Sequence, residues 1–87
     1  MLKVETWLKR ADAILAKPSF DLAAALALTQ EIRNQAGPGS IGIAAGQALG
    51  SLQAADRAGA RSRWQIAVAK QRLEEVRSAL VHHASRT

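Results

Sequence analysis

Cysteine is absent from this 87-residue chain, and so is tyrosine. Without cysteine the chain can form neither a disulfide nor a thiolate zinc site. A lack of disulfides is typical of proteins that work in a reducing compartment. Phenylalanine occurs once and tryptophan twice, so few aromatic side chains are present to stack on nucleic-acid bases.

Long apolar stretches are also missing. The longest uncharged run, residues 34–55, contains Pro38 and several glycines and amides, which make it too polar and too interrupted for a transmembrane helix. The first residues include an acid at Glu5 and further charges at Lys9 and Arg10, unlike a signal peptide. We therefore expect a cytoplasmic protein with no membrane partner.

Alanine and leucine, by contrast, are abundant. Both lead the scale of helix propensity, whereas residues that favour strands are scarce. A chain of this length builds one hydrophobic core, and short connections make consecutive helices antiparallel. The composition thus predicts an all-α fold with a single helical domain over residues 1–87, a small antiparallel bundle of three or four helices.

Four segments show helical periodicity, with turn-forming residues between them. The predicted helices span about 3–17, 19–36, 40–58 and 62–83, with Ser19, Ser40 and Ser62 as the expected N-caps. Pro18 ends the first helix and Gly37-Pro38-Gly39 ends the second. Gly59 marks a turn before the fourth helix; the alternative is a kink at Gly59 within one continuous helix.

Each segment carries an apolar stripe that predicts its buried face. The four stripes are Val4, Trp7, Leu8, Ala11, Ile14 and Leu15; Leu22, Ala25, Leu26, Thr29, Ile32 and Ala36; Ile41, Ala45, Ala48, Leu52 and Ala55; and Ile66, Ala69, Leu73, Val76 and Leu80.

Glycine recurs at every fourth position of the third segment, at Gly42, Gly46 and Gly50, and the row continues with Ala54. A glycine in a helix interior costs about 1 kcal/mol relative to alanine. The row therefore predicts that another backbone packs closely against it. On this hypothesis Gly46→Leu destabilises the fold by about 1–3 kcal/mol through overpacking.

Trp64 lies on the opposite side of the fourth helix from its apolar stripe, by the rule of roughly 100° per residue. Val68 and Gln71 are its neighbours on that side. Because aromatic residues are enriched in protein interfaces, we predict that Trp64, Val68 and Gln71 bind a partner. The alternative is that Trp64 folds against the end of another helix.

The net charge of +5 is concentrated in the second half of the chain. Residues 1–44 carry five basic and four acidic side chains, whereas residues 45–87 carry seven and three. Basic residues clustered along one helix are typical of an anion-binding surface. The candidate residues are Arg63, Lys70, Arg72 and Arg77 of the fourth segment, with Arg61 just before it and Arg57 before the turn. Glu74 and Glu75 interrupt this surface.

The sequence contains no pattern that predicts catalysis. The acids are scattered, and no nucleophile–base pair or phosphate-binding loop is recognisable. His82 and His83 are adjacent, so on a helix they diverge by about 100° and cannot share a metal ion. We expect a non-enzymatic protein without cofactor or metal site.

These patterns favour a small helical module for protein–protein contact, of an adaptor, chaperone-like or regulatory kind. The expected partner is another protein or a second copy of the chain in a homodimer. The alternative is a nucleic-acid-binding accessory protein that uses the basic residues of the last helix.

Overall fold

The computed structural model describes residues 3–59 and 63–85 of the chain. These ranges form four α-helices and no strand: α1 (Val4–Ala16), α2 (Leu22–Ala36), α3 (Ser40–Ala58) and α4 (Arg63–Ser85). The prediction of an all-α antiparallel bundle is confirmed, and the number of helices over the described ranges is four.

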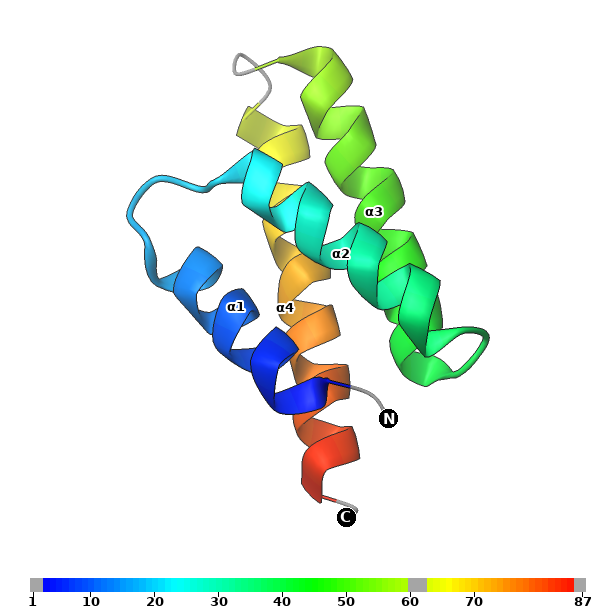
Figure 1. Ribbon diagram of the computed structural model, residues 1–87. Coiled ribbons are helices and arrows are strands. Elements are labelled where there is room, and N and C mark those ends of the chain that lie inside the picture. Colours follow the sequence, from blue (N-terminus) through cyan, green and yellow to red (C-terminus); the bar gives the residue numbers. More distant parts are fainter. Residues whose placement is uncertain (1–2, 60–62, 86–87) are drawn as a thin grey trace.

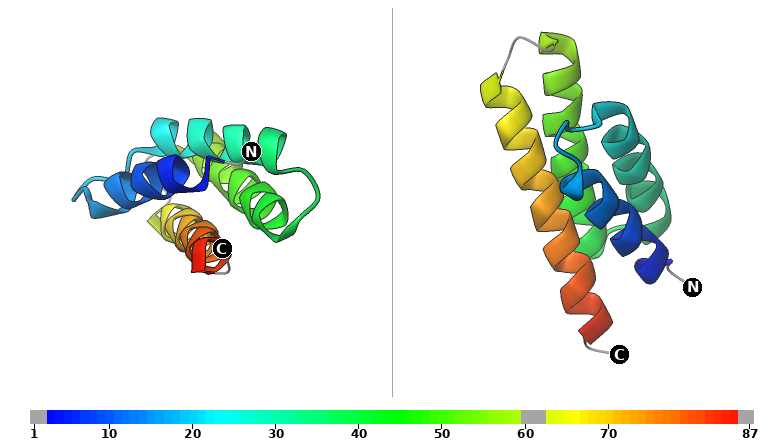
Figure 2. Two further views of the ribbon diagram at one scale, coloured as in Figure 1. Left: turned by 60° about the horizontal axis from the view of Figure 1, so that its bottom comes forward. Right: turned by 90° about the vertical axis from the view of Figure 1, so that its left-hand side faces the viewer.

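The helices run up and down in turn (Figure 1). The two longest, α3 and α4, lie antiparallel and pack extensively against each other. Figure 2 shows α1 and α2 as a layer over one side of this pair. In that layer α2 packs mainly on α3 and α1 mainly on α4, while the contact between α1 and α2 is smaller.

Two glycines end helices by adopting positive φ angles. Gly37 follows α2 with φ 67° and Gly59 follows α3 with φ 78°, a region that side chains with a Cβ rarely enter. The amide of Gly59 donates to the carbonyl oxygens of Ala55 at 3.1 Å and Asp56 at 3.3 Å. The helix therefore ends at Ala58, and the alternative of one helix continuing through Gly59 is wrong.

Two of the predicted N-caps are also wrong. Asp21, not Ser19, is the N-cap of α2, because its Oδ1 accepts from the amide of Ala24 at 3.0 Å. Ser40 is the first residue of α3 and Gly39 precedes it as the N-cap, with no side-chain hydrogen bond. Ser62 lies outside the described residues.

The predicted apolar stripes of α1, α3 and α4 contain the buried residues of those helices, except that Gly42 and Leu49 of α3 are buried as well. On α2 the predicted stripe contains the buried residues Ala25, Thr29 and Ile32 but misses Leu28. Leu28 is fully buried, whereas Leu22 and Leu26 are half-buried. Residues 22–28 are all alanine or leucine, so their pattern does not single out one side of the helix. Thr29 is buried there, and its hydroxyl donates to the carbonyl of Ala25 at 2.9 Å.

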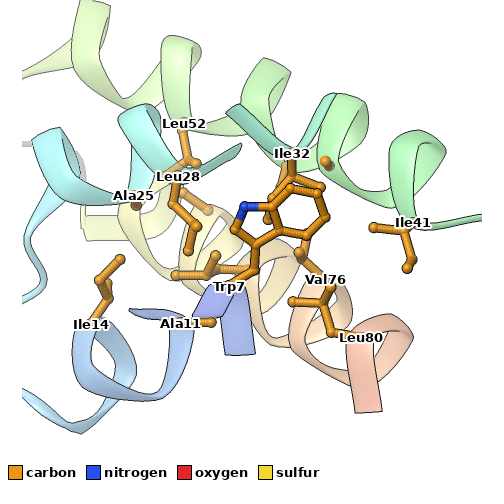
Figure 3. Packing of buried hydrophobic residues seen from close by; sticks show 14 of the residues in the cluster. Trp7, Ala11, Ile14, Ala25, Leu28, Ile32, Ile41, Leu52, Val76 and Leu80 are labelled. Carbon is orange, nitrogen blue, oxygen red and sulfur yellow. The ribbon is translucent and has the colours of Figure 1, made fainter. Parts of the chain in front are cut away.

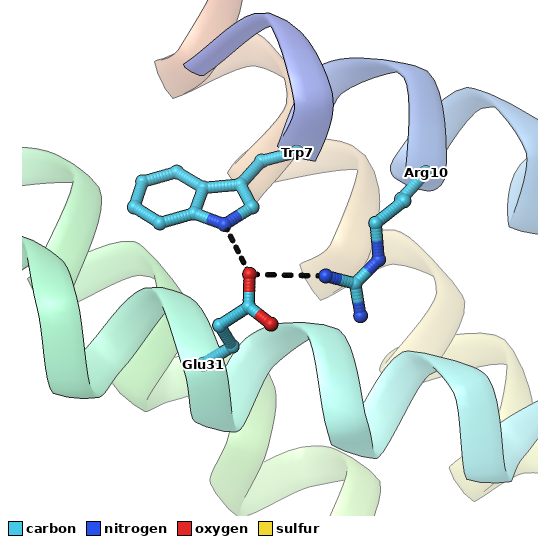
Figure 4. A network of polar contacts seen from close by, with 3 residues as sticks. All are labelled: Trp7, Arg10 and Glu31. Carbon is cyan, nitrogen blue, oxygen red and sulfur yellow. Dashed lines mark hydrogen bonds and ion pairs between the residues drawn. The ribbon is translucent and has the colours of Figure 1, made fainter. Parts of the chain in front are cut away.

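Trp7 is the one fully buried aromatic residue in the described part of the chain. Its ring projects from α1 into the core, among Ile32 of α2 and Val76 of α4 (Figure 3). The indole Nε1 donates to Oε2 of Glu31 at 2.7 Å, and Nη1 of Arg10 donates to the same oxygen at 3.0 Å (Figure 4). This network joins α1 to α2.

The carboxyl of Glu31 has a pKa below its ordinary value of 4.5, first because it accepts the hydrogen bond from Trp7 and then because it accepts one from Arg10. Both donors favour the charged form of the carboxyl. Since the native pKa is the lower one, Glu31 stabilises the fold above its unfolded pKa and loses this effect as the pH falls through its native pKa.

The glycine row of α3 packs closely at one position only. A Cβ on Gly42 would lie 1.8 Å from the carbonyl oxygen of Gly37, in the turn that leads into α3. A Cβ on Gly46 or Gly50 would meet no atom within 4 Å. The predicted close approach along the whole row is therefore wrong, because it occurs at Gly42 and not at Gly46 or Gly50.

We expect opposite effects from two matched substitutions in this row. Gly50→Ala should raise the free energy of unfolding by about 1 kcal/mol, since alanine favours the helix and its methyl group enters open space. Gly42→Ala should lower it by about 1–3 kcal/mol, because its methyl group collides with backbone. Urea titrations of both variants and the parent measure this; a Gly42→Ala protein as stable as the parent would contradict it.

The second expectation concerns pH. Glu31→Gln keeps an oxygen that can accept from Trp7 but removes the charge, so the variant should be less stable than the parent at pH 7. The difference should shrink as the pH is lowered below about 4.5, where Glu31 takes up a proton in the unfolded parent while the native carboxyl is still charged, and it should be lost once the pH has fallen through the native pKa. Urea unfolding at pH 7 and at pH values below 4 tests this, because the other carboxyls are common to both proteins. A difference independent of pH would show that the charge of Glu31 contributes nothing.

Candidate functional site

Trp64 lies in the first turn of α4 with 74% of its surface exposed. The buried residues of α4 are Ala69, Leu73, Val76 and Leu80, and Trp64 projects from the opposite side of the helix. The alternative that Trp64 folds against the end of another helix is therefore wrong. Of the large apolar side chains in the described ranges, Trp64 is the most exposed, ahead of Ile43 and Val81.

A shallow hollow lies beside Trp64, between the C-terminal half of α3 and the start of α4. These two helix ends are neighbours in Figure 1. Its volume is about 100 Å³, and its lining residues are Ser51, Ala54, Trp64, Gln65 and Val68. Small side chains on α3 form one wall, and the indole with Val68 forms the other. We call Trp64, Val68, Ser51 and Ala54 the Trp64 surface.

Helix geometry explains why these residues meet. Trp64 and Val68 are four residues apart on α4, and Ser51 and Ala54 are three apart on α3, so each pair shares one side of its helix. The antiparallel packing of α3 on α4 then brings the two pairs together. Ser51 and Ala54 were not predicted as site residues, although Ala54 continues the glycine row.

Gln71, the third residue of the predicted site, is exposed but does not line the hollow. It lies seven residues beyond Trp64, which corresponds to about 10 Å along α4. The structure therefore brings Trp64 and Val68 together and leaves Gln71 on the same side of the helix farther along.

The six predicted anion-binding residues differ in their surroundings. Nη1 of Arg72 contacts Oε1 of Glu75 at 2.9 Å, and Arg77 pairs with Asp12 of α1. Both positive charges are thus offset by an acid. Arg57, Arg63 and Lys70 are exposed, and Arg61 lies outside the described residues.

Arg57 and Arg63 flank the Trp64 surface. Arg57 comes three residues after Ala54, and Arg63 directly precedes Trp64. Each cation is therefore within one helical turn of a residue that lines the hollow. The site combines an exposed aromatic side chain, small apolar neighbours and positive charge at its edge.

Other chemistry is sparse in the part of the chain that the structure describes. No three side chains of His, Asp or Glu there are placed to hold a metal ion together. None of the four helices has the length and apolar character needed to cross a membrane. Comparison of the chain with protein-family models, with curated proteins and with solved structures finds no match.

Proposed function

We propose that this protein is a small non-enzymatic module for protein–protein contact, of an adaptor, chaperone-like or regulatory kind, and that the Trp64 surface binds its partner. The observation that carries the proposal is the 74% exposure of Trp64 beside an apolar hollow. Burying an indole at the centre of an interface commonly contributes about 2 kcal/mol or more to binding.

The bundle does not need Trp64 for its own core. Trp7 fills the centre of the core from α1, and the buried stripe of α4 begins at Ala69. Aromatic side chains are enriched in protein interfaces, so an exposed indole that the core does not use is well placed to contact another molecule. The partner is another protein or a second copy of the chain.

Nucleic-acid binding is the weaker alternative. Two of the basic residues on which it depends, Arg72 and Arg77, are already paired with acids. Arg57 and Arg63 lie near a single exposed indole rather than among several aromatic side chains that could stack on bases. A high ratio of absorbance at 260 to 280 nm at low salt, lost at high salt, would favour this alternative.

The proposed interface predicts that Trp64→Ala weakens association by more than about tenfold while the helical circular dichroism spectrum is retained. Analytical ultracentrifugation over a concentration series measures self-association. Retention of proteins from an extract of the native host by immobilised parent and variant measures binding to other partners.

Val81→Ala is the matched control. Val81 is also an exposed apolar residue of α4, but it lies seventeen residues from Trp64, about 25 Å along the helix. We expect this variant to associate like the parent. If the parent neither self-associates nor retains a protein that Trp64→Ala fails to retain, the proposed function is wrong.

A further inference from the structure

The outer face of α3 carries glycines that the fold does not require. A Cβ on Gly46 or Gly50 would meet nothing within 4 Å, so neither position needs glycine for internal packing. Both nevertheless weaken the helix relative to alanine. They are one turn apart, and the next residue in the row is Ala54, which lines the hollow beside Trp64.

Gly46, Gly50 and Ala54 form a strip without large side chains along the surface of α3, which we call the furrow, and its last member belongs to the Trp64 surface. From Gly46 to Ala54 it extends about 12 Å along α3, or rather more than two turns. Helices approach one another most closely where the side chains at the contact are small. A furrow of this shape suits a helix laid along α3 with one apolar side chain in the hollow, as in other helix-in-groove complexes.

The charge around the furrow selects the partner. Between residues 40 and 71, the described basic residues are Arg57, Arg63 and Lys70, all of them exposed, and the one described acid is Asp56. A second copy placed on this face would bring like charges together, which opposes binding. A partner with acidic side chains beside its apolar stripe would instead pair with Arg57 and Arg63.

We propose that the furrow of Gly46, Gly50 and Ala54 receives an acidic amphipathic helix from a different protein, with an apolar side chain of that helix packed between Trp64 and Val68. This inference rests on the proposed function and specifies the partner's chemistry. Glutamate or aspartate on the flanks of the helix meets Arg57 and Arg63. The small residues of α3 allow the backbone of the partner helix to approach α3 closely.

The probe is a phage-displayed library of amphipathic helices of about 18 residues, long enough to span the furrow. Their flanking positions are randomised among glutamate, glutamine and lysine. Selection on the parent protein should enrich glutamate, and the affinity of a selected synthetic peptide should fall as salt is added. Enrichment of lysine, no charge preference or no selected helix would overturn the proposal.

Two kinds of variant test the geometry with a selected peptide. Gly50→Leu fills the furrow without harming the fold, since leucine is the better helix former and the site is open; it should weaken binding by about tenfold or more, as should Trp64→Ala. Unchanged binding to Gly50→Leu would exclude the furrow as the docking site.

Charge reversal provides the second comparison. The double variant Arg57→Glu with Arg63→Glu should lose the acidic peptide. The control double variant, Lys9→Glu with Arg33→Glu, changes the net charge by the same amount at exposed positions of α1 and α2. This control should still bind the acidic peptide. Equal losses of peptide affinity in the two double variants would show that binding depends only on the net charge of the protein, and would overturn the proposed site. A homodimer that depends on Trp64 would leave the proposed function standing but overturn the acidic helix as the occupant.

Discussion

The buried indole of Trp7 and its hydrogen bond to Glu31 are the contact on which the arrangement of this bundle depends. Most of the core is alanine, leucine and isoleucine, and Trp7 supplies its largest buried side chain. An indole N–H without an acceptor is costly to bury. Glu31 accepts from it at 2.7 Å, and Arg10 compensates the charge of the carboxylate from the solvent side. A single network thus satisfies a buried donor and fixes α1 against α2.

Much of this fold is predictable from the sequence, and the failures have identifiable causes. On α3 and α4 polar and small residues separate most of the apolar ones, so the predicted stripes agree with the buried faces apart from Leu49 on α3 and the half-buried Ile66 on α4. On α2 the first seven residues are all alanine or leucine, so the sequence pattern does not identify the buried side of the helix, and Leu28 was not predicted to be buried. The Trp7–Glu31 contact could not be predicted because its partners are 24 residues apart, beyond the reach of any local pattern.

The candidate site, like the fold, could be predicted from the sequence only in part. The exposure of Trp64 could be predicted because the helical periodicity of α4 alone places this residue opposite the apolar stripe. The hollow also depends on Ser51 and Ala54, and their meeting with Trp64 depends on how α3 packs on α4. The sequence likewise could not show that Arg77 pairs with Asp12 of a distant helix. A count of basic residues in the sequence therefore predicted a larger basic surface than the structure has.

The ion pair between Asp12 and Arg77 joins residues 65 positions apart. Contacts between α2 and α3, and between α3 and α4, close much shorter loops and so cost less chain entropy to form. Contacts between α1 and α2 are also close in sequence, so we expect the contact between α1 and α4, which closes the longest loop, to form last. Substitutions in α1, such as Asp12→Ala, should then speed unfolding and leave the folding rate nearly unchanged, which stopped-flow kinetics would measure.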